Sequence, residues 1–240
     1  MKKRGGPKED VAGRPDWPVP FQVIGWSLRD WWDDWVNMVV LNLLLWLGWL
    51  TIVLGPPVTF GLYYVTKHLA RGRAMGPRTL LEGGRRYFWQ SWMWLLLNLI
   101  VALVIGANYF FYASLEPAWA NFMQAAFVLL GLAWLVVQFY AIPYFMEQEE
   151  KRISMALRNG LYTILAAPGY TVIVASTATL LIGLSVGTVA PLFLGAPCLV
   201  ALLGSRAVLE RLDSFGIRER EAVRKERLSE GKGEGETLPD

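Results

Sequence analysis

The segment LGPPVTFGLYYVTKHLARGR, residues 54–73, follows a strongly apolar stretch and carries two adjacent prolines, Pro56 and Pro57. A proline pair at the end of an apolar stretch can terminate a membrane helix, kink it, or begin a second helix after a turn. If residues 36–66 cross a bilayer once, the chain has five crossings; if it turns at 55–57, it has six. The structure of this segment therefore decides how many times the chain crosses the bilayer.

The amino-acid composition indicates a protein that folds in a lipid bilayer. The chain has 240 residues, of which 54% are hydrophobic and only 18% charged, and its mean hydropathy is +0.34. A soluble domain is about one quarter charged. Stretches without charge cover 35–66, 87–115, 117–146 and 159–205, and each can hold the roughly 20 residues that a crossing helix needs. We expect an all-α, polytopic membrane protein.

Positive charges predict the orientation of these helices. Of the 23 Lys and Arg residues, six precede residue 35, six lie in 67–86, three in 151–158 and eight from residue 206 onward. The turns at 113–121 and 187–192 contain none. Because short cytoplasmic loops retain Lys and Arg, these two turns are expected outside. Helices near 89–112, 121–145, 169–187 and 192–210 would then form two hairpins.

The same rule favours a turn at the proline pair. A turn places all 23 positive charges on one side of the membrane, with six crossings as three hairpins and both termini in the cytoplasm. Helices over 36–54 and 56–70 would rise roughly 28 and 22 Å, so the second is short for a bilayer. Five crossings with a kinked first helix remain the alternative.

Three regions are predicted along the chain. Residues 1–20 form a flexible basic tail, 21–213 a helical membrane domain, and 214–240 a charged, partly disordered cytoplasmic tail. Within the domain, 26–37 has the pattern of an amphipathic helix in the headgroup layer. Segments 77–92 and 153–170 share a plan, since each joins a basic cluster to an apolar hairpin. We interpret both as inner-leaflet helices of a weak structural repeat.

The parts of common active sites are missing from the sequence. The predicted spans hold no ionisable group away from their ends, and the chain has a single cysteine, Cys198, and a single histidine, His68. There is no GxxxxGK[ST], GxSxG, HExxH or CxxC motif. We expect neither enzymatic activity, nor a cofactor, nor a metal, nor nucleic-acid binding.

A few residues remain as candidates for function. Asn98 and Gln138 are polar groups inside predicted spans, where they either line a solute path or make hydrogen bonds between helices. Gly183 and Gly187 have the spacing of a close helix contact. The break in the first hairpin is a third candidate, structural or functional, formed by Pro56, Pro57, Thr59, Gly61 and Tyr64.

Three segments carry a family resemblance. GPPVTFGLYYVTKHLARGR at 55–73, PYFMEQEEKRISMALRNGLYTILAAPGYT at 143–171 and APCLVALLGSRAVLERL at 196–212 resemble the YesL-like family of bacterial integral membrane proteins, domain of unknown function 624. The resemblance covers about residues 21–216. The positions that match its motifs are Pro57, Thr59, Gly61, Tyr64, Ala156, Leu157, Arg158 and Asn159.

The resemblance implies a place in the bacterial cytoplasmic membrane and a link with carbohydrate uptake and utilisation, but no catalytic residue. We therefore expect a non-enzymatic accessory protein whose partners are the lipid bilayer, transporter subunits or a second copy of itself. The alternative is that the protein itself transports a small neutral solute.

Overall fold

The computed structural model describes residues 19–73 and 75–216, which form ten α-helices and no strand. The predicted tails at 1–20 and 214–240 lie almost entirely outside the described residues. The helices are α1 (Val19–Asp33), α2 (Trp35–Leu50), α3 (Gly55–Leu69), α4 (Pro77–Arg86), α5 (Phe88–Ala113), α6 (Ala118–Glu147), α7 (Ile153–Ala166), α8 (Pro168–Thr188), α9 (Ala190–Leu194) and α10 (Ala196–Ser214). The all-helical prediction is confirmed.

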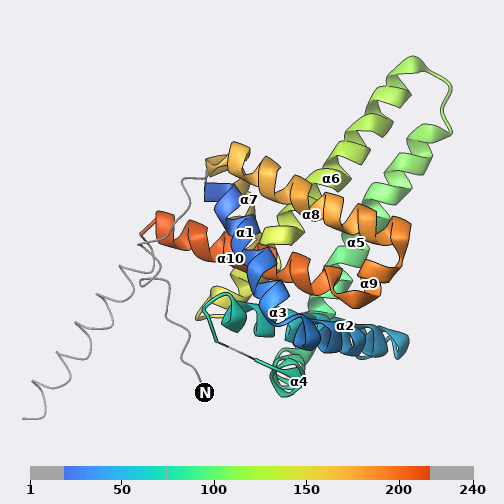
Figure 1. Cartoon of the computed structure of the whole chain (residues 1–240). Coiled ribbons are helices and arrows are strands. Elements are labelled where there is room, and N and C mark those ends of the chain that lie inside the picture. Colours follow the sequence, from blue (N-terminus) through green and yellow to red (C-terminus); the bar gives the residue numbers. More distant parts are fainter. Residues whose placement is uncertain (1–18, 74, 217–240) are drawn as a thin grey trace, which may run out of the picture.

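Three of the described helices, α5, α6 and α8, are long and apolar enough to cross a membrane. The pair α5 and α6 forms a hairpin that projects beyond the other helices (Figure 1). Its large apolar side chains are mostly exposed, among them Leu96, Leu103, Phe110 and Leu129. Lipid tails would cover such a surface, because in water it would be a strong aggregation site.

The proline pair marks a reversal of the chain. Residues 51–54 separate α2 from α3, Ile52 in this turn has φ +59°, and the two helices pack together. Pro56 lies within the first turn of α3, where its missing N–H has no helical partner to lose. The alternative of one continuous kinked helix is therefore wrong. However, α2 has 16 residues and α3 has 15, so neither reaches the length of a full crossing.

The last hairpin also differs from the prediction. A single helix was expected over 192–210, but the chain breaks at Gly195 into the five-residue α9 and the 19-residue α10. A β-carbon at Gly195 would lie 2.7 Å from the Trp31 indole nitrogen, so this position has room only for glycine. The number of helices that cross the bilayer stays a prediction.

Helix α10 occupies the centre of the fold. It contacts α1, α2, α3, α6, α8 and α9, and every residue from Cys198 to Ser205 is buried (Figure 1). One group of buried side chains joins α10 to α2 and α3, and a second joins it to α6 and α8.

Two units of the fold follow the same plan. In the first, α4 packs on α3 and leads through Tyr87 into the long helix α5; in the second, α7 packs on α6 and leads through Ala167 into α8. Glycines make both contacts close: a β-carbon on Gly84 would lie 3.0 Å from the Pro57 carbonyl oxygen, and one on Gly160 would lie 3.2 Å from that of Val137. This arrangement matches the shared plan seen in the sequence.

Candidate functional site

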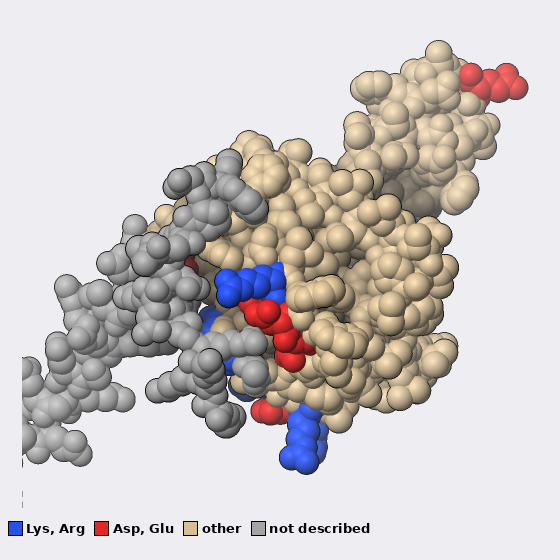
Figure 2. All heavy atoms as spheres, viewed as in Figure 1, with Lys and Arg blue, Asp and Glu red and all other residues tan. Residues whose placement is uncertain are grey.

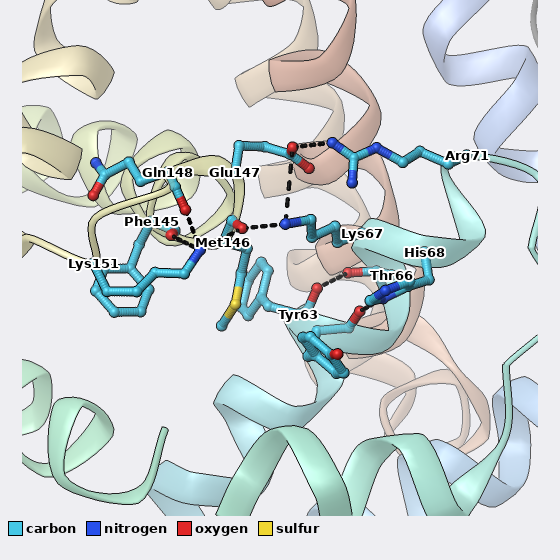
Figure 3. A network of polar contacts seen from close by, with 11 residues as sticks. Tyr63, Thr66, Lys67, His68, Arg71, Phe145, Met146, Glu147, Gln148 and Lys151 are labelled. Atoms are coloured by element: carbon cyan, nitrogen blue, oxygen red, sulfur yellow. Dashed lines mark hydrogen bonds and ion pairs between the residues drawn. The ribbon is translucent and has the colours of Figure 1, made fainter. Parts of the chain in front are cut away.

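The end of α3 meets the end of α6 in an ion-pair network (Figure 3). The Arg71 guanidinium donates to the Glu147 carboxylate, and the Lys67 ammonium lies 4.0 Å from the same carboxylate. Lys67 also donates to the Met146 carbonyl oxygen. The Glu147 side chain is only 11% exposed. Its charge is therefore held by two cations rather than by water.

Lys151, in the loop that follows α6, completes the network. Its ammonium donates to the carbonyl oxygens of Phe145, at 3.1 Å, and Met146, at 2.8 Å. These carbonyls belong to the last turn of α6, where no helical N–H is left to bind them and the helix dipole attracts a cation. Lys67 and Lys151 thus cap the same helix end.

Aromatic rings form the floor beneath these cations. The ammonium of Lys151 lies 5.8 Å from the centres of both the Tyr87 and Phe145 rings, and the Arg86 guanidinium lies 5.7 Å from the centre of the Tyr87 ring. Cation–π attraction therefore supports Lys151 and Arg86 at this position. We call Lys67, Arg71, Arg86, Lys151 and Glu147 the cation cluster.

Two further polar contacts tie the cation cluster to the centre of the fold. The hydroxyl groups of Thr66 and Ser205 lie 2.9 Å apart, joining α3 to α10 in a fully buried contact. The neighbouring Arg206 forms an ion pair with Asp30, which joins α10 to α1. On the face shown in Figure 2, the charged side chains gather in one region, and the projecting hairpin carries charge only at its acidic tip.

The chemistry available to the cation cluster is electrostatic. Four cations surround one carboxylate, so the cluster favours a further anion. His68 lies nearby, with its Nδ1 atom 2.7 Å from the Tyr64 carbonyl oxygen. The His68 ring also packs edge-on against the Tyr64 ring. Within the described residues, no group of three or more His, Cys, Asp or Glu side chains is arranged to hold a metal.

The charge of Lys151 is expected to depend on pH in the physiological range. Burial, together with the positive charge of Lys67, lowers the pKa of Lys151 from its ordinary value of 10.5 to about 8. Between these two pH values the unfolded chain binds a proton that the folded chain has released, so the folded state gains stability as pH rises.

This pH effect is testable with Lys151→Gln. Between pH 7 and 9.5, the Tm of the wild type in detergent should rise relative to that of Lys151→Gln. The control Arg152→Gln, at an exposed side chain on the same loop, should keep the wild-type pH profile. If the Tm of all three proteins changed with pH in the same way, Lys151 would titrate at its ordinary pKa.

The predicted break residues lie against α2 and α4. The Trp49 indole donates to the Thr59 hydroxyl at 3.1 Å, which ties α2 to α3, while Pro56, Pro57 and Gly61 are buried. A β-carbon on Gly61 would overlap the Leu80 carbonyl oxygen of α4. The Tyr64 ring packs edge-on against Tyr87 at the floor of the cation cluster. These five residues position helices, and only Tyr64 reaches the cluster.

Asn98 and Gln138 are brought together between α5 and α6. The Trp94 indole donates to the Gln138 side-chain oxygen at 2.7 Å, and the Trp134 indole donates to that of Asn98 at 3.0 Å. The Asn98 amide nitrogen donates to the Trp94 carbonyl oxygen at 2.9 Å. Of the two predicted uses, hydrogen bonding between helices is the one that these contacts make.

Gly183 and Gly187 lie on an exposed face of α8, and β-carbons at these positions would meet no atom of the chain within 4 Å. The predicted helix contact is therefore not made within the described part of this chain. Contact with another chain stays a prediction.

Asn42 is recognisable in the sequence as a polar group inside a predicted span, but its position at the α9–α10 break is not. Its amide nitrogen donates to the carbonyl oxygens of Leu192 and Phe193, each at 3.2 Å, and its side-chain oxygen accepts from the Cys198 backbone N–H at 3.2 Å. A fully buried asparagine in an apolar helix was the available signal. Its partners lie about 150 positions away, which no local pattern reveals.

Asn42→Ala is expected to destabilise the fold. The substitution leaves the buried Cys198 N–H without its partner, at a cost of about 1–3 kcal/mol. The partly buried carbonyls of Leu192 and Phe193 also lose a donor, although the Trp46 indole still donates to that of Leu192. The matched control is Asn108→Ala, because Asn108 is only half-buried and makes an exposed hydrogen bond to the Val104 carbonyl of its own helix. Thermal unfolding in detergent should show a lower Tm for Asn42→Ala alone. Equal losses in both variants would exclude a special role for Asn42.

The fold and the cation cluster together define a helical membrane protein with its charged side chains gathered in one region. Comparison with protein families, with curated proteins and with solved structures finds no match to this chain.

Proposed function

We propose that the protein is an integral protein of the bacterial cytoplasmic membrane with six crossings and both termini in the cytoplasm. The apolar surface of the α5–α6 hairpin and the gathering of the charged side chains support this topology (Figure 2). The short helices α2 and α3 would cross where neighbouring helices shield them or where the bilayer thins.

Topology can be tested at the N-terminal tail. With Cys198 replaced by alanine, Asp10→Cys should resist a membrane-impermeant maleimide in intact cells and react after lysis. Labelling in intact cells would exclude the proposed orientation.

We further propose that the protein acts as a non-enzymatic accessory protein for carbohydrate uptake, related to the YesL-like family. One observation carries the non-transporting role: Asn98 and Gln138 form hydrogen bonds with Trp134 and Trp94 inside the α5–α6 hairpin. Polar groups used in this way hold helices together instead of contacting a solute. The open face of α8 at Gly183 and Gly187 provides a surface for a transporter subunit or a second copy.

Purification from native membranes tests this role. The wild type should recover carbohydrate-transporter subunits, whereas Gly183→Leu combined with Gly187→Leu should recover several-fold less. Gly169→Leu is the matched control, since a β-carbon at Gly169 also meets no atom of the chain. Recovery of no transporter subunit by the wild type would count against the accessory role.

Transport of a small neutral solute is the second candidate. It is favoured by the Gln138 amide nitrogen, which is buried and has no hydrogen-bond partner within the described part of the chain. Purified protein in liposomes would then take up a neutral sugar, and Gln138→Leu would abolish the flux. Absence of flux for every sugar tried would remove this candidate.

A further inference from the structure

We propose that the outward faces of α4 and α7 bind the headgroups of anionic phospholipids. The inference rests on the proposed membrane location and adds a lipid preference to it. Its basis is the outward faces of the two short helices, which combine arginine with exposed apolar side chains.

Helix α4 has two contrasting faces. Leu80, Gly83 and Gly84 are buried against α3. The opposite face carries Arg78, Glu82, Arg85 and Arg86, and beside them Leu81 is 60% exposed. Because α4 approaches α3 through glycines, it lies flat on that helix with its arginines directed away from the fold.

The outward arginines of α4 are available for a ligand. Arg78 and Arg85 form no ion pair within the described part of the chain, although Glu82 lies on the same face. Three arginines and one glutamate give this ten-residue helix a net charge of +2. A guanidinium binds two oxygens of a phosphate group at once, so phosphate is the anion that this face fits best.

Helix α7 repeats the arrangement. Ala156, Gly160 and Thr163 are buried, with Gly160 directed at α6. The outward face carries Arg158 together with Leu161, Tyr162 and Leu165, of which Leu165 is 71% exposed. A row of apolar side chains beside an arginine is the pattern of a helix lying between the headgroups and the acyl chains.

The two surfaces adjoin at Tyr87. Arg86, at the end of α4, and Lys151, in the loop before α7, both lie over the Tyr87 ring. Each helix also leads through a single residue into a long apolar helix. In the proposed topology, α5 and α8 enter the bilayer from the same side, which would place α4 and α7 in the headgroup layer there.

Charge complementarity selects the lipid. Each arginine near an anionic surface contributes about 1 kcal/mol, or roughly a fivefold factor in binding. A zwitterionic headgroup carries a phosphate but no net charge, so it lacks this attraction. Phosphatidylglycerol should therefore be retained in preference to phosphatidylcholine.

Native mass spectrometry of the full chain in detergent, with equal amounts of these two lipids, measures the preference. The wild type should retain phosphatidylglycerol preferentially. Arg78→Gln with Arg85→Gln should lower the ratio of bound phosphatidylglycerol to phosphatidylcholine by between 5- and 25-fold, and Arg158→Gln by about fivefold. The control Arg29→Gln removes one exposed arginine of α1 and should change the ratio less than twofold. Elution as a single species confirms that each variant is folded.

Retention of the protein in carbonate-washed membranes, measured in parallel, separates the two proposals. A protein that stays in these membranes but binds both lipids equally would overturn the lipid inference and leave the membrane location intact. Equal losses in Arg158→Gln and in the control Arg29→Gln would also overturn it, because they would reflect net charge alone. Release by carbonate would contradict the membrane location itself.

Discussion

Glu147→Gln is expected to lower the free energy of unfolding by about 2–4 kcal/mol, a large effect for one substitution. Glutamine keeps the size of the side chain but removes the charge that neutralises Lys67 and Arg71. The two cations then face each other and Lys151 across a largely buried space without a counter-ion. Thermal unfolding in detergent should show the loss as a lower Tm.

Glu150→Gln is the matched control for this substitution. Glu150 forms an ion pair with Arg152, but both side chains are well exposed, at 74% and 65%. A surface pair of this kind contributes less than about 1 kcal/mol. Similar losses for the two variants would show that Glu147 is no better shielded from solvent than Glu150. Restoration of part of the stability by Lys67→Met in the Glu147→Gln background would confirm that the unpaired cation is the cause.

Gly61→Ala is expected to separate α4 from α3. The added β-carbon would overlap the Leu80 backbone carbonyl oxygen, which cannot rotate away as a side chain could. Overpacking of this kind costs about 1–3 kcal/mol, and more where backbone must move. Proteolysis of the variant in detergent should therefore cut the residues around α4 faster than in the wild type.

Gly106→Ala tests whether the effect is specific to this contact. A β-carbon at Gly106, in the middle of α5, meets no atom within 4 Å, and alanine favours the helix more than glycine does. This control should be as stable as the wild type or slightly more so. An unchanged Tm and cleavage pattern in Gly61→Ala would show that α4 can shift at little cost.

Local patterns in the sequence were sufficient for several elements of the fold. Uncharged stretches predicted the long helices α5, α6 and α8. The proline pair, together with the placement of all 23 positive charges on one side of the membrane, predicted the reversal between α2 and α3. Each of these features depends on residues close together in the chain. The amphipathic helices α4 and α7 belong to the same class.

Features that depend on packing between distant segments were not predictable in this way. Glu147 and Arg71 were each recognisable as charges at a helix end, but their pairing requires α3 to lie beside α6. The lack of room for a side chain at Gly195 comes from the Trp31 ring, which belongs to α1 and lies against a segment more than 160 positions later. A single sequence does not specify which helices become neighbours.

The central position of α10 has a consequence for biosynthesis. The chain is made from its N-terminus, so α10 leaves the ribosome after the six helices that it contacts. Until then, Thr66 and Asp30 lie in the membrane insertion machinery or the lipid without their partners Ser205 and Arg206. We expect the nascent protein to stay a target of membrane proteases until this last segment is inserted. Chains truncated before residue 196 should accordingly be degraded rapidly.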